Sequence, residues 1–161
     1  MKKSISPFMQ RSVYRKRKIL HATLEAIIGL FILLWIYTGL NKALDLENFK
    51  VQLGRSPFIQ PLAPWIALVL PVGEILLALL LVIKRTRLIA LYTSFFAMAL
   101  FTGYVFIMLR YSYDLPCSCG GVLEALSWEN HLIFNFTGTI LAAVGIFLQI
   151  GTTASKSVKS E

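Results

Sequence analysis

Four long runs of apolar residues, separated by short polar stretches, dominate the hydrophobic pattern of this chain. The runs cover residues 20–40, 62–83, 88–109 and 131–150. A helix of about 20 residues, rising about 1.5 Å per residue, crosses the ~30 Å hydrocarbon core of a bilayer. The pattern therefore predicts an all-α integral membrane protein whose four transmembrane helices form an up-down bundle.

The segments outside the predicted bundle are short. A transmembrane domain at 20–150 leaves a basic N-terminal segment at 1–19 and a polar tail at 151–161. Residues 43–53 mix apolar and charged side chains, which predicts a short amphipathic helix lying at the membrane interface. The polar stretch 84–87 is so short that the second and third helices must be antiparallel neighbours.

The basic residues are distributed unevenly between the two ends of the predicted helices. Twelve of the 16 Lys and Arg residues lie in the N-terminal segment, the 84–87 turn and the C-terminal tail. The positive-inside rule then predicts that both termini are cytoplasmic and that the two longer loops face outward. This topology accounts for the net charge of +8, so we expect no nucleic-acid partner.

The two cysteines of the chain, Cys117 and Cys119, lie one residue apart in a polar, glycine-rich stretch before the fourth helix. A disulfide that closes so small a loop adds little stability and is strained, which favours exchange with a partner's thiols over a structural bridge. The predicted topology places the pair outside the cytoplasm, where disulfides persist. A redox pair is therefore the leading interpretation, and a structural bridge and two idle thiols are alternatives.

A soft-metal site is a further alternative for the same cysteines. His131 follows Cys119 by twelve residues, and two thiolates with one imidazole would suit copper. The chain has no second Cys pair, and His131 can equally cap the fourth helix or lie among lipid headgroups. We therefore predict no metal site and no resident cofactor.

Two carboxylates lie inside the apolar runs. Glu74 is near the middle of the second run, where a charge costs roughly 2.5–3.5 kcal/mol on insertion scales. We expect its carboxyl to be protonated, or paired with a group that faces the bundle interior. Its role can be structural or functional. Glu25 lies near the cytoplasmic end of the first run and can reach the basic N-terminal segment, which indicates a structural role.

Small residues form a stripe on the fourth predicted helix. Gly138, Ala142 and Gly145 recur at helical spacing and allow a neighbouring backbone to approach closely. Packing within the bundle is the simpler interpretation, and assembly into a homo-oligomer through this face is the alternative.

These features together resemble the DoxX and MauE families of four-helix membrane proteins. The resemblance is carried by residues 38–42 (Thr-Gly-Leu-Asn-Lys) after the first helix, by the Phe49 segment and by Glu74. The Cys-x-Cys-Gly sequence before the fourth helix is more similar to MauE, the methylamine-utilisation type. The resemblance covers roughly residues 19–150.

The resemblance implies a bacterial inner-membrane protein that works with a thioredoxin-like partner in the periplasm. It further implies that Cys117 and Cys119 are the redox pair and that Lys42 and Glu74 are family positions. In MauE such a protein is thought to assist disulfide formation in methylamine dehydrogenase. We therefore expect an accessory to thiol–disulfide exchange, with its classification as an enzyme left open.

Other function classes stay open on the sequence alone. A scaffold or assembly subunit could recruit a periplasmic partner without using its thiols. A small transporter fits less well, because intramembrane polar residues are scarce. The chain is also similar to vitamin K epoxide reductase-like enzymes in having four helices, but those use two cysteine pairs.

Overall fold

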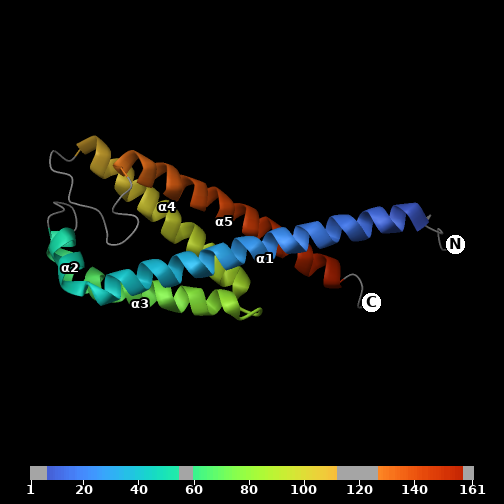
Figure 1. Cartoon of the computed structure of the whole chain (residues 1–161), viewed down its shortest axis with the longest axis horizontal. Coiled ribbons are helices and arrows are strands. Elements are labelled where there is room, and N and C mark those ends of the chain that lie inside the picture. Colours follow the sequence, from blue (N-terminus) through green and yellow to red (C-terminus); the bar gives the residue numbers. More distant parts are fainter. Residues whose placement is uncertain (1–6, 55–59, 112–126, 158–161) are drawn as a thin grey trace.

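The computed structural model describes residues 7–54, 60–111 and 127–157, and nearly all of these residues lie in helices (Figure 1). Cys117 and Cys119 lie outside the described residues. The elements are, in order, α1 (Pro7–Leu44), α2 (Leu46–Gly54), the short 3-10 helix η1 (Gln60–Leu62), α3 (Ala63–Val82), α4 (Arg87–Tyr111) and α5 (Trp128–Ser157).

Four of these helices are long and apolar enough to cross a membrane. The candidate spans are Tyr14–Leu44, Gln60–Val82, Arg87–Tyr111 and Glu129–Thr153. Large apolar side chains such as Leu100 and Phe147 point outward and are 72% and 76% exposed, as expected for a surface that faces lipid. The prediction of an all-α membrane protein with four spanning helices is confirmed for the described residues.

The four long helices run up and down alongside one another (Figure 1). α1 packs mainly along α3, and α4 packs mainly along α5. The α3·α4 and α1·α5 contacts join the two pairs. The two chain termini lie at one end, and α2 lies at the other end, together with the end of α4 and the beginning of α5 (Figure 1). Which of these ends faces the cytoplasm stays a prediction.

Two helices extend beyond the apolar runs from which they were predicted. α1 begins at Pro7, so that the basic residues from Arg11 to Lys18 belong to the same helix as the first run. No Gly or Pro interrupts residues 8–28, and a membrane-spanning helix supplies a template on which the basic turns can propagate. α5 likewise runs on to Ser157. Basic residues precede the first apolar run and small polar residues follow the fourth, and neither set ends its helix.

The core of the bundle is centred on α1. Its Trp35 indole is 2% exposed and donates a hydrogen bond from Nε1 to the Ser94 hydroxyl of α4, at 3.0 Å. This bond satisfies the polar edge of a large apolar side chain. The other buried core residues are Leu24, Ile27, Ile28, Phe31, Leu77, Ala78, Leu81, Ala90, Leu91, Met98, Ala142 and Ile146.

The small-residue stripe of α5 faces this core. A side chain at Gly138 would collide with Met98 of α4. A Cβ atom at Gly145 would lie 3.2 Å from Leu91 and 3.3 Å from Ile27. Neighbouring helices of the same chain therefore occupy the stripe, as its simpler interpretation expected.

Candidate functional site

The candidate site begins at a close approach of α1 and α3. A Cβ atom at Gly39 of α1 would lie 2.9 Å from Ile75 Cγ1 and 3.1 Å from the Pro71 carbonyl oxygen of α3. A side chain at this position would force the Ile75 side chain to shift and would press against the α3 backbone. Glycine at position 39 therefore allows the helices to touch at the level of Glu74, whose Cβ lies 3.3 Å away in the same direction.

One turn further along α1, Lys42 forms an ion pair with Glu74 of α3. The ammonium Nζ donates to Glu74 Oε1 at 2.8 Å and to Oε2 at 3.0 Å. Its third hydrogen bond goes to the Thr38 carbonyl oxygen at 3.3 Å. All three donors of the ammonium group are thus used. Of the two arrangements expected for Glu74, the structure shows the pairing with a charge on the inside of the bundle.

The ion pair is almost completely removed from the surface. The side chains of Lys42 and Glu74 are 9% and 4% exposed. α2 helps to enclose them, because its Phe49 ring lies 5.9 Å from the Lys42 ammonium, within the range of a cation–π contact. Phe49 and Leu53 of α2 pack against Ala63 and other residues at the beginning of α3. The predicted amphipathic helix therefore exists, with Phe49 and Leu53 on its buried face.

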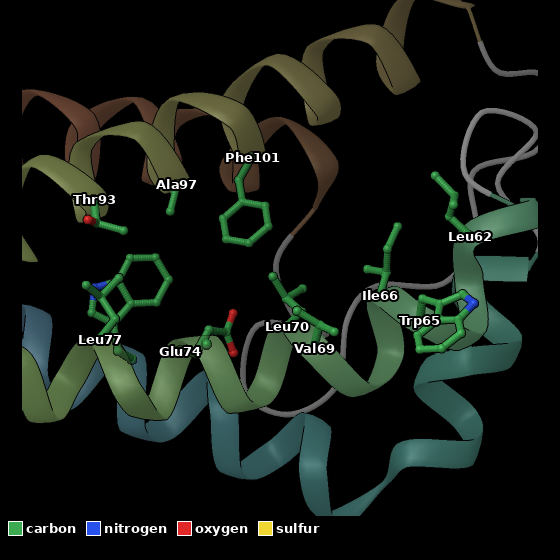
Figure 2. Close-up of a pocket in the computed structure, with 12 residues that line it drawn as sticks. Leu62, Trp65, Ile66, Val69, Leu70, Glu74, Leu77, Thr93, Ala97 and Phe101 are labelled. Atoms are coloured by element: carbon green, nitrogen blue, oxygen red, sulfur yellow. The ribbon is translucent and has the colours of Figure 1, made fainter.

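A groove lies on the other side of Glu74, between α3 and α4. Its volume is about 480 Å³, within the usual range for small-molecule sites. Figure 2 shows the Glu74 carboxylate pointing from α3 into this space, with Phe101 extending toward it from α4. Glu74 is the charged side chain among the described residues that line the groove, and Lys42 is not part of the lining.

The groove leads from an exposed rim to a buried floor. Trp65 and Val69 at the rim are 71% and 63% exposed. Trp35, Glu74 and Leu77 at the floor are each at most 5% exposed. Because the rim belongs to membrane-spanning helices, a molecule dissolved in the bilayer can reach the floor from the side.

A second ion pair joins α1 to the beginning of α4. Arg87 Nη1 lies 2.7 Å from Glu25 Oε1, and His21 Nδ1 lies 4.0 Å from the same oxygen. The principal partner of Glu25 is therefore Arg87 of α4, and the expectation that Glu25 pairs with the basic N-terminal segment is wrong. Arg87 follows the tight turn after α3 and also donates from Nε to the Leu81 carbonyl oxygen at 3.2 Å. This turn holds its guanidinium beside α1.

The remaining predicted site residues are Cys117, Cys119 and His131. Cys117 and Cys119 lie in the stretch that the structure leaves undescribed, so their pairing stays a prediction. His131 lies in the first turn of α5, and its backbone N–H donates to the Ser127 carbonyl oxygen at 3.0 Å. The copper alternative stays untested, because it requires both cysteines.

Sequence reasoning named Lys42 and Glu74 separately and missed their contact. A signal was present: a carboxylate in mid-membrane needs a partner, and few cations lie in the outer half of the predicted bundle. Gly39, Trp35, Ser94 and the groove were also missed. Their roles depend on which helix faces lie together, which an apolar run does not reveal.

Most of the chain matches a known protein family. The family described as methylamine utilisation protein MauE matches residues 20–148, which is most of the chain. The chain belongs to this family, and the resemblance seen in the sequence is confirmed on its MauE side. No curated protein and no solved structure matches the chain.

Proposed function

We propose that this member of the MauE family exchanges disulfides with a thioredoxin-like partner at the periplasmic face of the bacterial inner membrane. Cys117 and Cys119 are the reacting pair. The observation that carries the proposal is a Cys-x-Cys pair beside a membrane span in a chain of this family. The protein that finally receives the disulfide is a secreted one, such as the methylamine dehydrogenase of the family's namesake pathway.

The arrangement of the helices supports the periplasmic position of the pair. The undescribed stretch 112–126 connects the end of α4 to the beginning of α5, and both lie opposite the chain termini (Figure 1). Twelve of the 16 basic residues belong to the side of the termini. With that side in the cytoplasm, the cysteines face the oxidising compartment.

The exchange needs no reactant beyond the two cysteine pairs. A thiolate of the reduced pair attacks one sulfur of the partner's disulfide, a mixed disulfide forms, and the partner's other sulfur leaves as a thiolate. The second cysteine then attacks the mixed disulfide and releases the partner as a dithiol. The Cys117–Cys119 pair is thereby oxidised by two electrons and the partner is reduced by two. Run in reverse, the same steps reduce the Cys117–Cys119 disulfide and release the partner in its oxidised form, and this is the direction that supplies a disulfide to the secreted protein.

The described helices supply a frame for this chemistry. The buried ion pair between Lys42 and Glu74 joins α1 to α3, and the core around Trp35 joins α1 to α4. The reacting stretch 112–126 follows α4 directly. A scaffold that only recruits a partner would use the same frame, so the thiols must be tested directly.

The decisive experiment traps the mixed disulfide. Of the variants Cys117→Ser and Cys119→Ser, one lacks the attacking thiol and the other lacks the resolving thiol. The variant without the resolving thiol should retain a covalently bound periplasmic partner. The adduct should disappear with reductant on a non-reducing gel and contain a thioredoxin-like protein by mass spectrometry. Ser118→Ala is the matched control, because it alters the same stretch but keeps both thiols.

Topology is measured in the same strains. A membrane-impermeant maleimide should label the reduced cysteines in intact spheroplasts. Labelling only after lysis would place the pair in the cytoplasm and overturn the proposal. If neither single variant traps a partner and the double variant behaves as wild type, the scaffold function is the better account.

A further inference from the structure

The groove between α3 and α4 combines an apolar wall with one ionic group. Along α3 its lining runs from Leu62 to Leu77, a length of about 22 Å at the rise of an α-helix. Apart from Glu74 and Thr93, the side chains of the lining are apolar or aromatic. A ligand for this site must therefore have a long apolar part and one small polar head.

The hydrogen-bond donors in and around the groove already have partners. Trp35 Nε1 already donates to the Ser94 hydroxyl, and the Thr93 hydroxyl donates to the Ile89 carbonyl oxygen. Lys42 uses its three donors on Glu74 and on the α1 backbone. The floor therefore presents acceptors, and the donor in any further hydrogen bond must come from the ligand.

Glu74 has acceptor capacity left for such a bond. A carboxylate offers about four lone-pair positions, and the ammonium group occupies one on each oxygen. The Thr38 hydroxyl of α1 donates to the Leu34 carbonyl oxygen of its own helix, at 3.0 Å. Lys42 and Thr38 both belong to α1, whereas the groove opens toward α4 (Figure 2). A hydroxyl group inside the groove can reach the carboxylate from that open side.

From these contacts we infer that the groove binds a membrane-soluble hydroquinone, an aromatic ring with hydroxyl groups and an apolar tail. One ring hydroxyl donates to Glu74. The ring lies against the aromatic side chains of Trp35 and Phe101, whose centroids are 6.5 Å apart. The tail follows Leu70 and Ile66 toward the exposed rim at Trp65. The oxidised quinone, which has acceptors only, binds more weakly.

A second groove of similar size provides an internal comparison. It has a volume of about 540 Å³ and lies between α4 and α5, with Gly103, Phe106 and Phe136 in its lining. No charged side chain occurs among the described residues that line it. A lipid acyl chain would fill either groove equally well, but of the described residues that line the two grooves only Glu74, in the first, offers a hydroquinone a carboxylate.

Binding is tested on the purified full-length chain in nanodiscs under anaerobic conditions. Quenching of tryptophan fluorescence is followed with decyl-hydroquinone, decyl-benzoquinone and the dimethyl ether of decyl-hydroquinone. A hydrogen bond to a charged group corresponds to a factor of about ten or more in affinity. The hydroquinone should bind saturably, and about tenfold more tightly than the ether after correction for each probe's intrinsic quenching.

Two glycine variants locate the site. A side chain at Gly73 meets no neighbour within 4 Å and lies in the first groove, so Gly73→Leu should fill the groove without disturbing the bundle. Gly103→Leu is the matched control in the second groove, where a Cβ atom also has open space. We expect a tenfold or larger loss of hydroquinone affinity for Gly73→Leu and less than a twofold change for Gly103→Leu.

Several outcomes would overturn the inference. Equal affinity for hydroquinone and ether would mean that the groove holds only an acyl chain. Equal losses in the two glycine variants would mean that binding is not located in the first groove. The ligand series in wild type decides the matter even if a variant fails to fold. This binding does not depend on the cysteines, so it can fail or succeed independently of the disulfide trap.

Discussion

α1 carries two ion pairs, one with Arg87 at the beginning of α4 and one with Glu74 in the middle of α3, and they differ in burial rather than in distance. Arg87 and Glu25 are 2.7 Å apart, and Lys42 and Glu74 are 2.8 Å apart. The Glu25 side chain is 41% exposed, whereas that of Glu74 is 4% exposed. The first pair lies where the chain leaves the predicted membrane, and the second lies between packed helices.

The two ion pairs have nearly equal distances but should contribute unequally to the free energy of unfolding. The Arg87–Glu25 pair is partly exposed, with side chains 13% and 41% exposed, and such a pair contributes about 0–1 kcal/mol, because water competes for the carboxylate and salt screens it. Loss of one partner from a buried pair leaves a charge that has neither water nor a counter-ion, at a cost of about 3–5 kcal/mol. The Lys42–Glu74 pair should thus control how α1 and α3 pack together, and the Arg87–Glu25 pair should stabilise the contact between α1 and α4 only slightly.

The largest effect is expected from breaking the buried pair on one side. Glu74→Leu leaves the Lys42 ammonium group without its carboxylate partner, and we expect the free energy of unfolding to fall by about 3–5 kcal/mol. Denaturant unfolding of the detergent-solubilised protein measures this loss. The same variant removes the proposed hydroquinone acceptor, so stability and ligand affinity should fall together.

The double variant Lys42→Met/Glu74→Leu is the control for that prediction. It removes both charges and keeps similar side-chain volumes, which is often neutral or stabilising for a buried pair. We expect it to recover most of the stability that Glu74→Leu loses. If the double variant is as unstable as the single one, loss of packing rather than an unpaired charge is responsible.

An intermediate effect is expected from separating the two helices that hold the buried pair. Gly39→Val places a side chain against the Pro71 carbonyl oxygen and Ile75, and overpacking of this kind costs about 1–3 kcal/mol. Gly29→Val is the matched control on the same helix, because a Cβ atom there meets nothing within 4 Å. The two melting temperatures should differ clearly; equal values would mean that close approach at Gly39 is unimportant.

The smallest effect is expected from the partly exposed pair, Arg87 and Glu25. Glu25→Gln removes one charge but leaves an amide that can still accept a hydrogen bond from Arg87, so the loss should stay below about 1 kcal/mol. The difference from wild type should shrink further as salt is raised. Unfolding measured at low and high ionic strength tests this. A loss as large as that of Glu74→Leu would erase the distinction between the two pairs.

The sequence by itself determined the fold class and the number of spans. Each apolar run is a local property of about 20 successive residues, and its length alone must match the bilayer. The short helix containing Phe49 was equally visible, because its apolar and charged residues alternate within a few turns. The family was also accessible, since its distinguishing residues can be read directly from the chain.

The tertiary structure decided everything that depends on how the helices are rotated and paired. Lys42 and Glu74 are 32 positions apart, and their contact requires Gly39 to admit α3 at one level of α1. Glu25 illustrates the same point, because its partner Arg87 comes from a turn 62 positions away. The groove beside Glu74 likewise arises from the spacing of α3 and α4. A hydrophobic pattern specifies that a helix lies in a membrane. It does not specify which helices pack together, because lipid and protein interiors are similarly apolar. Small residues and polar contacts select the helix partners, and only the assembled bundle brings these residues together.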